Sequence, residues 1–169
     1  MPLAVVSLIW DAEKSSGSQR VTYDEDGYHL VRFPYEGESY DPWKMHDPAN
    51  GGGDSEDFPH PTSGLVYPSH DGWGLLSAMV HWEKDGEPHE YRARFVRNPL
   101  AEEYDSTATT DWAETGGGQY KSFLWQFFVY KDVPLGLKVS ARGKGDTKLG
   151  TPLMHAQFKL AIHTDVAEP

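Results

Sequence analysis

The stretch that decides the fold is residues 70–99, which read HDGWGLLSAMVHWEKDGEPHEYRARFVRNP. Its first run, Trp73–Glu83, alternates: one face carries Gly74, Leu76, Ala78, Val80 and Trp82, and the other carries Trp73, Leu75, Ser77, Met79 and His81. A side-chain period of two is typical of a β-strand. Both faces are largely apolar as far as Met79. We therefore expect a strand buried on two sides, either between two layers of one subunit or with its outer row at a contact between subunits.

A second strand is expected at Glu90–Arg97, where Tyr91, Ala93 and Phe95 alternate with Arg92 and Arg94. Such alternation of apolar and charged residues is typical of a half-exposed strand. The polar stretch Lys84–Pro88, which contains Asp85-Gly86, separates the two runs. A short polar loop with Asp-Gly favours an antiparallel turn, so the two runs are predicted to form a β-hairpin in the middle of the chain.

The same period of two runs through the rest of the chain. Further strands are predicted at Leu3–Trp10, Arg20–Tyr23, Tyr28–Tyr35, Gly64–Tyr67, Ser122–Lys131, Leu135–Ala141 and Met154–Ile162. Only Pro99–Ala113 is expected to hold a short helix, and Trp82 and Trp125 are expected in the core. About eight to ten antiparallel strands at this spacing predict an all-β jelly-roll sandwich, with residues 1–169 as a single domain.

Composition narrows the classes of partner. The 169-residue chain has 15 basic and 26 acidic residues, a net charge of −11, and no cysteine. This balance argues against nucleic acid as a partner, because phosphate binding needs clustered Lys and Arg. The apolar run near the N-terminus is too short to cross a bilayer, so no membrane insertion is expected. Most of the charged residues are read as solvated, with electrostatic steering or a contact between subunits as the alternative. The basic ones are Arg92, Arg94, Arg97, Lys138, Arg142, Lys144 and Lys148.

Motifs for catalysis are absent from the sequence. The eight histidines show neither His-x-His spacing nor an HExxH helix, and there is no G-x-S-x-G nucleophile. No catalytic residue, metal ligand or cofactor is therefore predicted. The stretch 47–57 is rich in oxygen-bearing side chains, and calcium is possible there, although the order of an EF-hand loop is missing and a solvated loop is the alternative.

Three residues are candidates for ligand binding. Trp43, His46 and Trp112 lie in acidic, loop-like surroundings. An exposed tryptophan there would offer a flat platform to a sugar ring. The alternative is that these apolar side chains anchor their loops.

The chain resembles phage tail and virion proteins that have the tumour necrosis factor-like jelly roll, the fold of the complement globular head. The resemblance is carried by Tyr40-Asp41, Met45–Pro48, Gly72, Ser77, Ala78, Val80, Trp82, Phe95, Arg97 and Asn98. Three positions depart from the pattern. Gly74 stands where an aromatic is usual, with Trp73 expected to fill that volume. Pro99 replaces a turn glycine, and Leu137 replaces an aspartate.

This resemblance implies a homotrimer around a threefold axis, with Trp73, Leu75 and Met79 at the subunit interface and an ion as an option on the axis. It implies a structural protein of a phage virion, made in the host cytoplasm, which binds other virion proteins and a host-surface glycan and is not an enzyme. The first strand starts near Met1, which favours a compact appendage over the end of a long fibre. A minor tail protein, a fibre tip and a capsid decoration all stay open. The alternatives are a free-standing carbohydrate-binding module and a cupin- or glycosidase-type enzyme.

Overall fold

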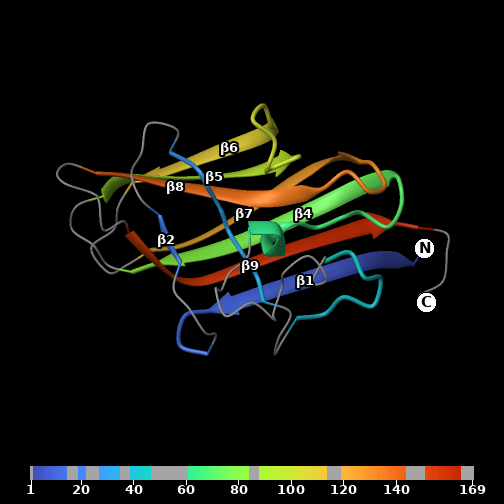
Figure 1. Cartoon of the computed structure of the whole chain (residues 1–169), viewed down its shortest axis with the longest axis horizontal. Helices are drawn as coiled ribbons and strands as arrows, with labels where there is room; N and C mark the ends of the chain where they lie inside the picture. Colours follow the sequence, from blue (N-terminus) through green and yellow to red (C-terminus); the bar gives the residue numbers. More distant parts are fainter. Residues whose placement is uncertain are drawn as a thin grey trace.

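A computed structural model describes residues 2–14, 19–21, 27–34, 39–46, 61–83, 88–113, 119–143 and 151–164. Within these ranges it describes all side chains except those of residues 61, 88–89, 107–113, 119 and 142–143. The described residues form two antiparallel sheets that pack face to face (Figure 1). The expected all-β jelly-roll sandwich is confirmed.

Each sheet has four strands along its path. The first sheet has the order β1-β9-β4-β7 and the second β3-β8-β5-β6, while β2 pairs with β9 off the path. The bounds are β1 Leu3–Asp11, β2 Arg20–Val21, β3 His29–Leu30, β4 Gly72–Trp82, β5 Pro88–Arg97, β6 Asp105–Ala113, β7 Gln119–Val129, β8 Leu135–Gly143 and β9 Thr151–His163. Among the described residues the only helical element is a 3-10 turn at Pro61–Gly64.

The core lies between the two sheets and is filled by the inward rows of their strands. Phe158 of β9 lies with its ring centroid 5.8 Å from that of Phe95 of β5 and 6.4 Å from that of Phe33. Trp82 and Tyr91 meet across the sandwich at 5.1 Å, and both are buried. Aromatic pairs at these separations add to the stabilisation that comes from buried area alone, so they fasten one sheet to the other.

The predicted hairpin of the two central runs was wrong. β4 pairs with β7 and β9, whereas β5 pairs with β6 and β8, so the two runs belong to opposite sheets. Each has a neighbour on both of its edges: β7 and β9 flank β4, while the following strand β6 and the more distant β8 flank β5. The apolar faces of β4 and β5 therefore meet across the core instead of lying side by side. The other face of β4 points away from the second sheet.

Three smaller expectations also changed. The helix predicted within Pro99–Ala113 is strand β6, whose Thr-rich sequence suits the free edge of β5. Trp73 does not fill the volume beside Gly74, because Trp73 points outward and is 49% exposed. A Cβ at Gly74 would lie 2.7 Å from Val129 Cγ1, so β7 already occupies that space.

Candidate functional site

The outward surface of the first sheet is apolar and uncovered by other described residues. We call it the open face and define it by Trp73, Leu75, Met79, Tyr120, Leu124 and Phe128. Trp73 lies opposite Phe128 in the β4–β7 register, and Leu124 lies opposite Ser77. The side chains of Trp73, Leu124 and Phe128 are 49%, 77% and 43% exposed. Exposed apolar side chains that lie together in this way are common at surfaces that contact another molecule.

The predicted interface residues all lie on this face. Trp73 is exposed, while Leu75 and Met79 are half-buried among their neighbours. The alternative that this row is covered by a second layer of the same subunit does not fit Trp73. Their role at a subunit contact stays a prediction.

A hollow of about 440 Å³ lies in the centre of the open face. Its walls include Met79, Leu124, Gln157 and Lys159, and its floor is formed by small residues such as Ser77 and Ser122. Because Ser77 and Ser122 lie on neighbouring strands, two short side chains leave space where longer ones surround them. The hollow is therefore shaped to receive a projecting side chain rather than a flat surface.

Trp125 lies at the rim of the sandwich, beside the open face. It belongs to the inward row of β7, and its neighbour in that row, Phe123, reaches the core with its ring 4.8 Å from that of Phe95. Trp125 is nevertheless 45% exposed, so the expectation that it packs in the core was wrong. β7 ends the first sheet and β6 ends the second. Among the described residues, Trp125 at this rim is therefore left partly open to solvent.

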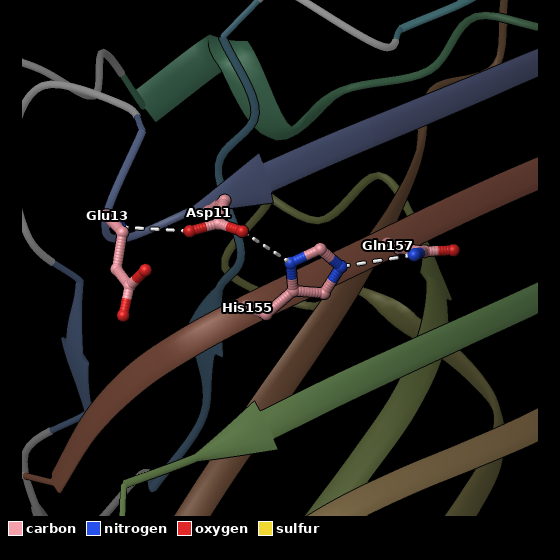
Figure 2. A network of polar contacts seen from close by, with 4 residues as sticks. All are labelled: Asp11, Glu13, His155 and Gln157. Atoms are coloured by element: carbon pink, nitrogen blue, oxygen red, sulfur yellow. Dashed lines mark hydrogen bonds and ion pairs between the residues drawn. The ribbon is translucent and has the colours of Figure 1, made fainter.

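Figure 2 shows a network of polar contacts among Asp11, Glu13, His155 and Gln157. His155 pairs with Asp11 and His81, so the network lies on the outward face of the first sheet. The carboxylate of Asp11, at the end of β1, accepts a hydrogen bond from the backbone N–H of Glu13 at 2.9 Å and lies 3.4 Å from Nδ1 of His155. The amide nitrogen of Gln157 lies 3.1 Å from Nε2 of His155. The backbone hydrogen bond from Glu13 is the main cause that lowers the pKa of Asp11. Asp11 thus stays ionised and orients His155.

His81 lies directly opposite His155 and stacks on an aromatic ring. The centroids of His81 and Tyr120 are 3.7 Å apart and their planes differ by 10°. The pKa of His81 is lowered, chiefly because burial disfavours its charged form and secondly because of the neighbouring His155. With Asp11 and Met154, these rings line a second hollow of about 330 Å³. This end of the face is therefore sensitive to protonation.

The candidate binding residues of the loops behave differently from the expectation. His46 is 1% exposed, and its Nε2 lies 2.7 Å from the carbonyl oxygen of Ser63. Trp43 is half-buried, packs against the core and has its ring 5.0 Å from that of His70. His46 therefore offers no surface to a ligand, and Trp43 anchors its segment.

A buried carboxylate holds the backbone of this segment in a turn. Asp41 accepts hydrogen bonds from the backbone N–H groups of Met45 and His46 at 2.8 and 2.7 Å. Burial raises the pKa of Asp41, and the two backbone donors oppose that shift. The sequence pattern from Tyr40-Asp41 to Met45-His46 thus encodes a turn that is closed by the hydrogen bonds to Asp41.

Two predicted features lie outside what the structure describes. Trp112 has its backbone in β6, opposite Tyr91, but its side chain is not among those described. Residues 47–60 hold the calcium candidate and are also not described, so calcium stays a prediction.

Among the described residues, no group of three His, Asp or Glu side chains is placed to hold a metal ion. In the same part of the chain, no helix has both the length and the apolar character that crossing a membrane requires.

Comparison with known proteins identifies the fold. Neither the family models nor the curated proteins contain a match to this sequence. Among solved structures, the globular domain of the zebrafish complement 1qA protein aligns with a TM-score of 0.58 at 12% identity, over 96% of this chain and 98% of that one. Murine APRIL at pH 8.0 aligns with a TM-score of 0.53 at 10% identity, over 96% of this chain and 100% of that one. The fold is a tumour necrosis factor-like jelly roll. Likeness at this identity shows the fold alone.

Proposed function

We propose that this protein is a homotrimeric display domain, whose role is to bind and to build a structure rather than to catalyse. The observation that carries the proposal is the open face, where Leu124 is 77% exposed and Trp73 49% exposed. On a lone monomer such a surface would be an aggregation liability. A contact between copies of the chain would bury it.

The positions of the open face and of Trp125 at the rim favour an assembly in which copies of the chain form a closed ring. The open face covers one side of the first sheet, and Trp125 projects at the adjacent rim. A contact between two different surfaces of the same protein is head-to-tail, and such contacts close into a ring when the rotation permits. We propose that the rim of one copy, with Trp125, docks on the open face of the next. The central hollow of about 440 Å³ would receive a side chain of that rim.

The proposed setting is the surface of a phage virion, as a tail appendage or a capsid decoration. Support comes from the sequence pattern that runs from Tyr40-Asp41 to Asn98 and from the fold, which suits a compact trimer. In this setting, loops distant from the trimer axis would contact other virion proteins or a host-surface glycan. Detection of the chain in purified particles by mass spectrometry, at a copy number divisible by three, is the expected result. Its absence from particles would contradict this setting.

The assembly is tested by a matched pair of substitutions. Leu124→Glu places a charge on the open face, whereas Leu100→Glu places one on a leucine that is 51% exposed in the turn before β6. A charge buried at a subunit contact without a partner costs several kcal/mol, so Leu124→Glu should weaken the assembly by at least about a hundredfold. Sedimentation velocity should then show monomers for Leu124→Glu and trimers for Leu100→Glu. Identical assembly of both variants would overturn the proposed face.

A further inference from the structure

The opposite sheet carries a pair of cations that face each other. Arg94 of β5 and Lys138 of β8 are direct partners in the antiparallel register, so their side chains leave the same face of the sheet. Lys138 is only 8% exposed, and Arg94 is half-buried. Like charges directly opposite each other on a sheet destabilise it, which calls for a compensating contact.

The other arginines of β5 have such a contact. Arg92 Nε donates to the carboxylate of Glu90 at 2.8 Å, and Arg97 Nη1 donates to that of Asp105 at 2.7 Å. Arg94 lies between them in sequence but meets no carboxylate among the described residues. Among the described residues, the arginine of β5 that lacks a carboxylate partner is therefore the one that lies opposite Lys138.

Two tyrosines hold the cation pair instead. The guanidinium carbon of Arg94 lies 3.5 Å from the ring centroid of Tyr28, and Nη1 donates to the hydroxyl of Tyr104 at 3.3 Å. The ammonium of Lys138 lies 3.4 Å from the ring centroid of the same Tyr104. Cation–π contacts of this kind stabilise a charge but do not neutralise it. Among the described residues, no carboxylate neutralises these two positive charges, which lie side by side.

Polar atoms of Arg94 and Tyr28 also lack hydrogen-bond partners among the described residues. In the described structure, Nε of Arg94 and the hydroxyl of Tyr28 are buried without a hydrogen-bond partner. A guanidinium has five N–H donors in a fixed fork, and only Nη1 of Arg94 has an acceptor among the described residues. Burial lowers the pKa of Lys138, and the charge of Arg94 lowers it further. An anion would supply the charge and the acceptors that the described residues do not provide.

We propose that Arg94 and Lys138, framed by Tyr28 and Tyr104, form a binding site for an oxyanion of the sulfate or carboxylate type. The fork of an arginine matches the paired oxygens of such groups, and a lysine adds a point charge beside it. The site lies on the sheet opposite the open face and does not depend on the proposed trimer. An oxyanion of this type is carried both by free inorganic anions and by acidic sugars.

The test uses the full chain and two probes, inorganic sulfate and glucose 6-sulfate, measured by isothermal titration calorimetry at constant ionic strength. Lys138→Met keeps the buried stem but removes the charge, and Arg94→Gln removes the fork. Lys131→Gln, at an exposed lysine just after β7, is the control for net charge. We expect both site variants to weaken binding at least about tenfold and the control to bind as the unchanged protein does.

The melting temperature with and without sulfate gives a second readout. It distinguishes a binding role of Lys138 from a merely structural one. Without anion, Lys138→Met should be at least as stable as the unchanged protein, because it relieves the repulsion with Arg94. Added sulfate should raise the melting temperature of the unchanged protein and of Lys131→Gln more than that of Lys138→Met, since only a bound ligand adds to the general effect of sulfate. Equal affinity for both probes indicates a site for the small anion, and tighter binding of the sugar sulfate indicates a saccharide site. Absence of binding, or binding that survives in both site variants, would overturn the proposal.

Discussion

The two outward faces of this sandwich differ sharply, although they enclose the same core. The open face of the first sheet presents Trp73, Leu124 and Phe128 to solvent. On the second sheet, the outward side of β8 is covered: a Cβ at Gly136 would lie 2.6 Å from a methyl of Leu30 and 2.9 Å from Pro99. The chain thus covers the outward side of β8 with its own segments, whereas large apolar side chains of the open face stay exposed.

The faces also differ in charge. Arg92, Arg94 and Lys138 lie on the outward face of the second sheet, whereas the open face is mainly aromatic and aliphatic, with polar side chains around its hollow and at one end. Apolar area removed from water stabilises an assembly by about 25 cal/mol per Å², while charges at a subunit contact need partners. The open face is therefore the one suited to contact between copies, and the charged face is suited to a polar ligand.

The largest effect is expected in the core that both faces share. Phe158→Ala removes a fully buried ring that contacts Phe33 and Phe95 and should lower the free energy of unfolding by about 3–5 kcal/mol. Leu124→Ala on the open face should change the unfolding of the dissociated monomer by less than about 0.5 kcal/mol. Urea titrations of both variants measure this contrast. A cost at Leu124 comparable to that at Phe158 would mean that Leu124 belongs to the core.

A smaller difference in the free energy of unfolding is expected between two small substitutions, one on the covered face and one on the open face. Gly136→Ala inserts a carbon against Leu30 and Pro99 and should cost about 1–3 kcal/mol. Ser77→Ala, in the hollow of the open face, should stay within about 0.5 kcal/mol in the monomer. Equal costs in urea unfolding would contradict the difference in covering.

The smallest expected effect is a dependence on pH at the polar end of the open face. Because the pKa of His81 is lowered in the folded protein, the unfolded chain binds more protons than the folded one as pH drops below about 6.5. Stability present above that pH should therefore fall on acidification through the folded pKa. His81 faces Tyr120 and His155, with Asp11 beyond His155.

The matched variants are His81→Phe, which keeps a ring on Tyr120 but cannot be protonated, and His163→Phe, at an exposed histidine of the same sheet. The fall in the urea midpoint between neutral and mildly acidic pH should shrink in the first variant and persist in the second. An unchanged pH profile in His81→Phe would show that another group causes the fall.

Much of the fold could be predicted because alternation is a local property. The period of two placed β4, β5, β8 and β9 close to their observed bounds. Strand partners could not be predicted in the same way: β4 and β5 look like a hairpin in sequence, yet β4 pairs with the distant β7 and β9, and β5 pairs with the following β6 and with β8. Likewise, its place in the middle of a strand suggested that Trp125 packs in the core, but β7 lies at the end of its sheet and the residue is 45% exposed.

The sites were harder to predict, for the same reason. Trp73, Leu75 and Met79 could be assigned to an outer row from sequence, whereas Leu124 and Phe128 join them only through the β4–β7 register. His46 and Trp43 looked like surface residues of an acidic loop, but the clamp by Asp41 turns that segment inward. The partners of Arg94 and Lys138 are Tyr28, just before β3, and Tyr104, just before β6, at opposite edges of the second sheet. No local sequence pattern could therefore have predicted that site.

The most direct test of the central claim is the absolute mass of the purified protein in solution, measured by multi-angle light scattering over a range of concentrations. Assembly through the open face predicts a mass three times that of the 19.0 kDa chain, stable on dilution. A mass of one chain at every concentration, with Trp73 and Leu124 still exposed, would contradict it.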